Sequence, residues 1–436
     1  MSCKTKKLNI IQVALLYALI IVLFWLDGSP ISLVGYSMIG ICSIFTPLLS
    51  LSVLGASNYL PAVLGVSPFS ISLGIALIVM LLRGFLHKPA RSRVVDVRML
   101  VLLPLIVFWS VISGSIQNDM SFTSSMVTSF IAYVVISFFL NKFEHRNKAI
   151  DYLMAGVGVG VILAIFINFG ISGFESSHFA RLAIGERADP NSTGLLLAIF
   201  SVYSFVQFTN KINDGLRKVV PHILMLLLGA WGLLLTQSRG SVLCVCLVIM
   251  VYILFTKKKG LGDRGLITVI ALCFFVTVVL ALTGDKVLGV LWDALYEFIF
   301  RVQNTASVDG ERLYLLQKSF ESFFENPLFG VSLSEFEFFA GHIPHNTFSD
   351  YMVTNGIVGI MFFVIMFAVP IISYRPSRRA YELYIAYFCY FVCFLNTLFY
   401  SASNEKMLVV LLAILIHLVE VDAESKHRLK IKNTEN

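Results

Sequence analysis

Long apolar runs separated by short polar segments form the main pattern of the chain. A helix of about 20 apolar residues is long enough to cross the hydrocarbon core of a bilayer, so each run predicts a membrane-spanning helix. From residue 99 onward the predicted spans lie near 99–116, 122–140, 150–171, 190–210, 219–236, 240–256, 266–283, 347–373, 380–400 and 405–421.

The first 98 residues continue this pattern less regularly. An apolar run from Leu8 to Leu26 follows a basic N-terminal segment. Because the run is long and no small-residue cleavage site follows it, we interpret it as a retained first span rather than a signal peptide. Residues 31–86 are apolar but interrupted by prolines, and they predict two or three more spans. The expected fold is an all-α polytopic transmembrane helical bundle of about twelve to fourteen spans.

The composition supports residence in a membrane. Hydrophobic residues make up 57% of the 436 residues and charged residues only 14%, and the mean hydropathy is +0.84. A soluble domain is about 25% charged, so this chain has too few charges to cover a water-exposed surface. The net charge of +7 does not indicate nucleic-acid binding, because most Lys and Arg lie in short loops between apolar runs.

The basic loops predict the orientation of the bundle. Counted through the predicted spans, they all fall on one side, which the positive-inside rule makes cytoplasmic. The opposite side then carries a loop at 172–189, a tight turn at Gln237–Arg239 and one large loop from Gly284 to Asn346. The basic loops contain Arg83, Lys88, Arg91, Arg93 and Arg98; Lys142, Arg146 and Lys148; Lys211, Arg217 and Lys218; Lys257, Lys258, Lys259 and Arg264; Arg375, Arg378 and Arg379; and the tail residues Lys426, Arg428, Lys430 and Lys432.

This topology divides the chain into five segments. The large extracytoplasmic loop contains two amphipathic stretches near 287–301 and 309–325, which predict short helices that lie along the membrane surface or cap the bundle. The apolar side chains of the second stretch are Tyr314, Leu315, Phe320, Phe323 and Phe324. The predicted segments are N-terminal spans at 1–98, central spans at 99–283, the loop at 284–346, C-terminal spans at 347–421 and a cytoplasmic tail at 422–436.

The few cations on the outer side are the first candidates for function. Outside the large loop they are Arg181, Arg187, Arg239 and Lys406. Arg239 lies in a very short turn, where it either binds an anion or caps a carbonyl at the membrane boundary. Arg187 precedes Asp189-Pro190, which predicts the N-cap and first turn of the next helix. Anions bind well at such a helix end, although Arg187 has Glu186 and Asp189 as alternative partners.

A histidine occupies a similar position at the end of the large loop. His345 precedes Asn346 and Thr347, either of which is suited to cap the following span. The positive end of that helix disfavours an imidazolium, and a neutral imidazole can accept a proton as a general base. His342 is the alternative in the same segment, and simple solvation of either ring is the alternative to function.

Together these residues predict a site for a lipid diphosphate on the outer side. A guanidinium group binds phosphate oxygens in pairs and remains charged. The chain has no Asp-rich segment and no zinc-like spacing of Cys and His, so no metal ligand set is expected, and arginine would neutralise the leaving group.

Several motifs occur in the order typical of the bacterial O-antigen polymerase/ligase superfamily, which the chain resembles from about residue 150 to residue 370. The ordered set around one large outer loop is more specific than any single motif. The motifs are Arg187 ahead of Asp189-Pro190-Asn191, then Thr236-Gln237-Ser238-Arg239-Gly240, then Glu311-Arg312, Asn326-Pro327-Leu328-Phe329-Gly330 and Pro344-His345-Asn346, and finally Gly356-Ile357-Val358-Gly359.

The resemblance implies a membrane glycosyltransferase that needs no cofactor. Its donor would be an oligosaccharide on undecaprenyl diphosphate, transferred en bloc to an acceptor hydroxyl at the outer leaflet of the bacterial inner membrane. Arg187 and Arg239 would bind the diphosphate, and His345 would orient or deprotonate the acceptor hydroxyl. The remaining candidates for substrate binding are Arg312, Arg181, Asn346 and His342.

Three functions remain open from the sequence. A polymerase of polysaccharide repeat units for O-antigen, capsule or exopolysaccharide is the preferred one, and an O-antigen ligase acting on the lipid A core is the first alternative. A flippase or exporter of lipid-linked oligosaccharide is an alternative from a different class. The partners implied by the resemblance are the lipid-linked donor, an acceptor glycan, membrane lipids, a chain-length regulator and a flippase.

Overall fold

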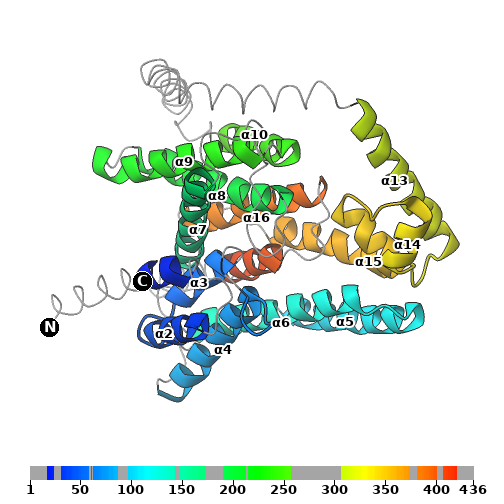
Figure 1. Ribbon diagram of the computed structural model, residues 1–436, viewed down its shortest axis with the longest axis horizontal. Coiled ribbons are helices and arrows are strands. Elements are labelled where there is room, and N and C mark those ends of the chain that lie inside the picture. Colours follow the sequence, from blue (N-terminus) through cyan, green and yellow to red (C-terminus); the bar gives the residue numbers. More distant parts are fainter. Residues whose placement is uncertain are drawn as a thin grey trace, which may run out of the picture.

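The structure is a computed structural model, and it describes a bundle of α-helices (Figure 1). The described residues are 17–23, 31–57, 60, 62–86, 97–142, 148–171, 190–212, 215–236, 238–256, 306–373, 381–399 and 406–419. The labelled helices are α2 (Ile31–Phe45), α3 (Leu49–Ala56), α4 (Pro68–Leu86), α5 (Val97–Gln117), α6 (Ser121–Lys142), α7 (Ala149–Ile171), α8 (Pro190–Lys211), α9 (Leu216–Thr236), α10 (Arg239–Thr256), α13 (Ala306–Glu325), α14 (Leu333–Ala340), α15 (Thr347–Ser373) and α16 (Tyr381–Thr397).

These helices confirm the all-α class, and most of the predicted spans coincide with a described helix. From residue 97 on, each described helix of the bundle lies within a few residues of a predicted span, and helix Lys406–Val419 matches the last one. The described helices long and apolar enough to cross a membrane are Ser121–Asn141, Pro190–Lys211, Lys218–Thr236 and Thr347–Pro370, and seven others are apolar but shorter. The predicted span at 266–283 lies outside the described residues, so the total number of spans stays a prediction.

The stretch 31–86 forms three helices of unequal length. Helix α3 has eight residues, all buried, and is only about 12 Å long, so it does not cross the bilayer. It packs against α7 so closely that a Cβ on Gly156 would lie 1.8 Å from the carbonyl oxygen of Ser52. Of the predicted two or three spans, α2 and α4 are therefore the candidates.

Side-chain contacts fix the relative directions of the central helices. Asn191 at the start of α8 meets Ser238 at the start of α10, and Thr209 near the end of α8 bonds to Tyr252 near the end of α10 at 2.9 Å. These two helices are therefore parallel. Helix α9 runs in the opposite direction to α8, because Lys211 at the end of α8 meets His222 near the start of α9.

The described basic residues between these helices lie at one end of the bundle. Asp151 in the first turn of α7 accepts hydrogen bonds from Tyr203 at 2.8 Å and Gln207 at 2.9 Å, both in the second half of α8. Lys148 precedes α7, and Lys211 ends α8, so both lie at this end. The arrangement agrees with the predicted sorting of basic loops to one side.

Candidate active site at the opposite end of the bundle

Arg239 begins helix α10 directly after a very short turn from α9. Ser238 occupies the turn, and its backbone N–H donates to the hydroxyl of Thr236 at 3.3 Å. Its carbonyl accepts the N–H of Val242 at 3.1 Å, which starts the hydrogen-bond ladder of α10. Arg239 is half-buried. Its guanidinium is thus attached to the positive end of a helix, where an anion is favoured.

A chain of buried polar side chains connects this turn to two other helices. The Ser238 and Ser241 hydroxyls are 3.0 Å apart, and Ser241 donates to Oδ1 of Asn396, near the end of α16, at 2.8 Å. Ser238 also donates to Oδ1 of Asn191, in the first turn of α8, at 3.4 Å. The first turns of α8 and α10 therefore lie side by side, held by polar groups of three helices. Gly194 permits this approach, because a Cβ there would lie 2.8 Å from Cβ of Ser238.

The other two outer arginines cannot be placed. Arg187 and Arg181 lie outside the described residues, as does the predicted N-cap Asp189. Helix α8 does begin at Pro190, as the sequence predicts.

The second part of the candidate site is the segment between α14 and α15. Helix α14 ends at Gly341, which is in the left-handed conformation with φ 82°. His342 and His345 are both exposed, and Pro344 between them is buried. Oδ1 of Asn346 accepts the N–H of Ser349 at 2.7 Å, so Asn346 rather than Thr347, the other predicted candidate, caps α15, and His345 stands one residue before this cap.

Helix α15 is divided at Gly356, where the chain reverses its direction. Gly356 has φ 57° and ψ −138°, far from helical values. The ring centroids of Phe348 and Phe363 are 5.5 Å apart, although residues this far apart along a straight helix would be separated by about 22 Å. Residues 347–355 therefore fold back along the second part of α15. The predicted helix at 347–373 is confirmed in its bounds, but it consists of two parts.

The loop 326–330 replaces the hydrogen bonds that this reversal removes. In a continuous helix the N–H of Ile357 would donate to the carbonyl of Val353. Here Val353 accepts instead from the N–H of Val331 at 2.7 Å, and Ile357 donates to the carbonyl of Pro327 at 2.8 Å. The loop 326–330 and the break at Gly356 thus depend on each other, because each supplies backbone hydrogen-bond partners to the other.

Glycine is required on both sides of this contact. Gly330 has φ 72°, and a Cβ there would lie 2.0 Å from the carbonyl oxygen of Val353. A Cβ on Gly356 would lie 2.4 Å from the carbonyl oxygen of Pro327. Any larger residue at either position would separate the two backbones.

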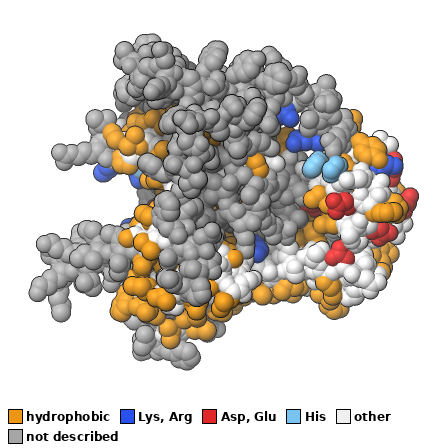
Figure 2. All heavy atoms as spheres, in the orientation of Figure 1, with side chains coloured by type: hydrophobic (Ala, Val, Ile, Leu, Met, Phe, Trp, Pro, Cys, Tyr) orange, Lys and Arg blue, Asp and Glu red, His pale blue; other side chains and the backbone are white. Residues whose placement is uncertain are grey.

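Helix α16 connects the two parts of the candidate site. The ring of Phe394 packs against Phe363 with centroids 5.0 Å apart, and two residues later Asn396 bonds to Ser241. Since Phe363 also contacts Phe348, the N-terminal ends of α10 and α15 lie at the same end of the bundle. On the face shown in Figure 2, histidine side chains lie next to Lys or Arg side chains near the end formed by α13 and α14.

Arg312 lies exposed on α13, one of the two helices that cover this end of the bundle (Figure 1). The second predicted amphipathic stretch is confirmed as α13, and the first, at 287–301, lies outside the described residues. Leu315 on α13 is buried in a small core with Phe336 of α14 and Val353 of α15. Tyr314, Phe320 and Phe324 are exposed, so only part of the predicted apolar set packs inward.

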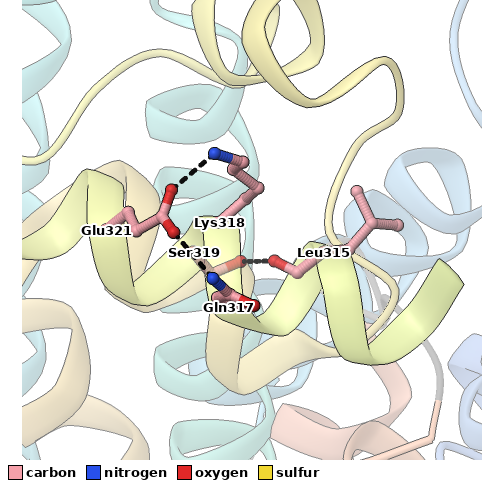
Figure 3. A network of polar contacts seen from close by, with 5 residues as sticks. All are labelled: Leu315, Gln317, Lys318, Ser319 and Glu321. Atoms are coloured by element: carbon pink, nitrogen blue, oxygen red, sulfur yellow. Dashed lines mark hydrogen bonds and ion pairs between the residues drawn. The ribbon is translucent and has the colours of Figure 1, made fainter. Parts of the chain in front are cut away.

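Charged and polar side chains stabilise the outer surface of α13 (Figure 3). Glu321 accepts a hydrogen bond from Gln317 at 2.9 Å and pairs with Lys318 at 2.6 Å. The hydrogen bond from Lys318 lowers the pKa of Glu321, and the same bond raises the pKa of Lys318. Ser319 donates to the carbonyl of Leu315 at 2.7 Å inside the same helix.

The sequence does not reveal the polar side chains that hold the candidate residues in place. Ser238 and Ser241 lie within the motif around Arg239, but only the arginine is an unusual cation on the outer side. Asn396 is a single amide at the end of an apolar run, a position where polar side chains often bond across helices. Among the described residues, no group of three or more His, Cys, Asp or Glu side chains is placed to hold a metal ion.

Comparison with known protein families finds a match in the central part of the chain. Residues 224–364 match the family described as O-antigen ligase. The matched region contains Arg239, Arg312, His345, the loop 326–330 and the break at Gly356, whereas α5 and α8 lie outside it. No curated protein matches the chain.

Proposed function

We propose that this multi-pass membrane protein polymerises polysaccharide repeat units. The match of residues 224–364 to the O-antigen ligase family supports its membership of the O-antigen polymerase/ligase superfamily. Members of this family are glycosyltransferase-like enzymes. The single observation that carries the proposal is that Arg239 and His345 both lie at helix N-termini on one end of the bundle.

The donor in this proposal is an oligosaccharide on undecaprenyl diphosphate. When the bond between the anomeric carbon and the phosphate oxygen breaks, negative charge develops on the departing diphosphate. Arg239 and the first turn of α10 would stabilise this charge without a metal ion, since preorganised donors act strongly on developing charge. Arg187, three residues before α8 in the sequence, would add a second guanidinium, with Arg312 and Arg181 as supporting contacts.

The acceptor is a sugar hydroxyl of a second lipid-linked repeat. Its oxygen forms the new bond to the anomeric carbon, and His345 would take the proton that this oxygen loses. The Asn346 cap supports this role, because it holds His345 directly ahead of the N-terminus of α15. His342 and Asn346 would orient the acceptor.

The test uses the full-length protein in lipid nanodiscs and the undecaprenyl-diphosphate-linked repeat that accumulates in a strain lacking this gene. We expect His345→Ala and Arg239→Ala each to lower the rate of linkage formation at least about 100-fold. Arg239→Lys should also be poor, because Lys keeps the charge but not the two-pronged geometry. Lys218→Ala, at the other end of the bundle, is the matched control. Normal polymer from the first two variants would refute the site.

The same assay separates the polymerase from the other two functions. A ligase, favoured by the description of the matched family, would transfer the glycan only when lipid A core is supplied. A flippase would move the lipid-linked repeat and form no glycosidic bond. New linkages between repeats in the absence of both lipid A core and a transmembrane gradient therefore identify a polymerase.

A further inference from the structure

Helix α5 touches the reversal of α15 through a row of polar side chains. Ser110, Ser113 and Gln117 lie three or four residues apart, so they share one face of an otherwise apolar helix. All three side chains bond to the α15 segment or to the loop 326–330, although α5 lies more than 200 residues earlier in the chain.

The central contact is between this row and two backbone carbonyls. Nε2 of Gln117 lies 2.7 Å from the carbonyl oxygen of Phe329 and 3.0 Å from that of Thr354. The Ser113 hydroxyl donates to the same two carbonyls, at 2.9 Å for Thr354. Nε2 of Gln117 also lies 2.9 Å from the Ser113 hydroxyl oxygen, so the two amide N–H groups and the one hydroxyl proton are shared among this oxygen and the two carbonyls.

The Thr354 carbonyl needs an outside donor because of the reversal at Gly356. In a continuous helix it would accept the N–H of residue 358. Thr354 is buried, and a buried carbonyl without a donor is costly, so Gln117 and Ser113 replace the lost intrahelical bond. One turn earlier on α5, Ser110 donates to Oδ1 of Asn355 at 2.7 Å.

Aromatic packing adds to the same contact. The ring of Trp109 on α5 stacks on Phe329 of the loop, with centroids 5.0 Å apart and planes 7° from parallel. The folded-back segment is also held from α6, where the ring of Phe122 meets Tyr351 edge to face at 5.2 Å. The short helix 347–355 is therefore fixed at its end by α5 and on its side by α6.

We propose that Gln117 and Ser113 are positioning residues for the transfer reaction, which fix the short helix 347–355 and thereby the placement of His345 at its start. The inference rests on the proposed function of His345 as the base that takes the acceptor proton. It also assigns part of the site's framework to α5, outside the region that matches the O-antigen ligase family.

The experiment compares Gln117→Ala, Gln117→Glu and Ser113→Ala with Ser115→Ala in full-length protein in nanodiscs. Ser115 is the matched control, because its hydroxyl bonds only to the carbonyl of Val111 in its own helix and is exposed. Three properties are measured: kcat and donor KM with the undecaprenyl-diphosphate-linked repeat, deuterium exchange of the backbone amides of 347–355, and the unfolding temperature.

For Gln117→Ala we expect kcat to fall about 10- to 100-fold, because a displacement of about 1 Å can cost this much. The donor KM should stay within about twofold, since Arg239 is untouched, and the amides of 347–355 should exchange faster. Gln117→Glu should lower kcat further, because a carboxylate would face two carbonyl oxygens. Ser113→Ala keeps both amide donors, so it should be more stable than Gln117→Ala and lose kcat by about three- to tenfold.

Two results would overturn the inference. Faster exchange and a lower unfolding temperature with wild-type kcat per folded molecule would make the contact purely structural. Equal losses of kcat in Ser115→Ala and Ser113→Ala would show that the contact of Gln117 and Ser113 with the two carbonyls has no specific role. If Arg239→Ala and His345→Ala are inactive while Gln117→Ala has wild-type kcat, only this inference fails; if those two variants are active, the proposed function fails instead.

Discussion

The two parts of the candidate site are held in place by different kinds of hydrogen bond. Around Arg239 the bonds join side chains, from Asn191 through Ser238 and Ser241 to Asn396. Around His345 the bonds are mainly backbone to backbone or side chain to backbone, with the loop 326–330 exchanging partners with α15. The first arrangement can lose one bond at a time, whereas the second depends on two backbones that fit together only as a whole.

The largest expected loss of polymer formation is from a methyl group added at Gly356, where α15 contacts the loop 326–330. In Gly356→Ala the new Cβ would lie 2.4 Å from the carbonyl oxygen of Pro327, at a φ of 57° that side chains rarely adopt. We expect the loop to separate from α15 and polymer formation to fall at least about 100-fold, since His345 would no longer be placed for reaction. Linkage formation and the yield of monodisperse protein measure this effect.

Gly74→Ala on α4 is the control, because nothing lies within 4 Å of a Cβ there and the backbone is helical. This substitution should leave polymer formation unchanged. A Gly356→Ala protein with wild-type yield and normal polymer would contradict the claim that the two backbones must fit as a whole.

The spans and the positions of Arg239 and His345 followed from local properties of the sequence. Apolar run length predicted the helices, and the cap at Asn346 was expected from its side chain and its place before an apolar run. His345 lies at a helix N-terminus, as the sequence indicated, and Arg239, which the sequence placed in a short turn, begins α10. These features depend on a few neighbouring residues, and for that reason a single sequence reveals them.

The reversal of α15 could not be predicted in the same way. Gly356 and Gly359 lie within an apolar run, and glycine is common in membrane helices, so the run predicts one continuous helix. The break is stabilised by Pro327, Val331 and residues of α5, which are distant in the sequence. The polar residues of α5 recur at helical spacing in the sequence, but the carbonyls that they bind cannot be identified from it.

An intermediate effect is expected from removing one bond near Arg239. Ser241→Ala takes the donor from Asn396 and a partner from Ser238, all buried. We expect the free energy of unfolding to fall by about 1 kcal/mol, the usual size for one such bond between membrane helices. Linkage formation should fall by only about two- to fivefold, because Arg239 and the helix end remain.

Unfolding in mixed micelles and linkage formation in nanodiscs measure the two quantities, with Ser115→Ala on α5 as the matched serine control. Suppose that Ser241→Ala lowered stability and linkage formation as much as Gly356→Ala. The hydrogen-bonded side chains around Arg239 would then be as cooperative as the backbone contact between the loop 326–330 and α15. The contrast between the two regions would then be lost.

The smallest expected effect is from the ion pair on the outer surface of α13. In Glu321→Gln the pair with Lys318 is removed, but both side chains are partly exposed to water, so the interaction is weak. The pKa of Glu321 is lowered in the folded protein, so the stability the pair contributes is present above the unfolded-state pKa of about 4.3 and is lost as the pH falls through the folded-state pKa. The pKa of Lys318 is raised, so its contribution is present below about pH 10 and lost above the folded-state pKa.

The difference in stability between wild type and Glu321→Gln should therefore be small and constant from roughly pH 5 to pH 10, and it should vanish in acid. It should also shrink with added salt, which screens exposed charges. Polymer formation should stay within about twofold of wild type, because α13 remains anchored by the buried Leu315. A large loss of polymer in this variant would mean that the outer surface of α13 takes part in the reaction, and that the site extends beyond the two regions compared above.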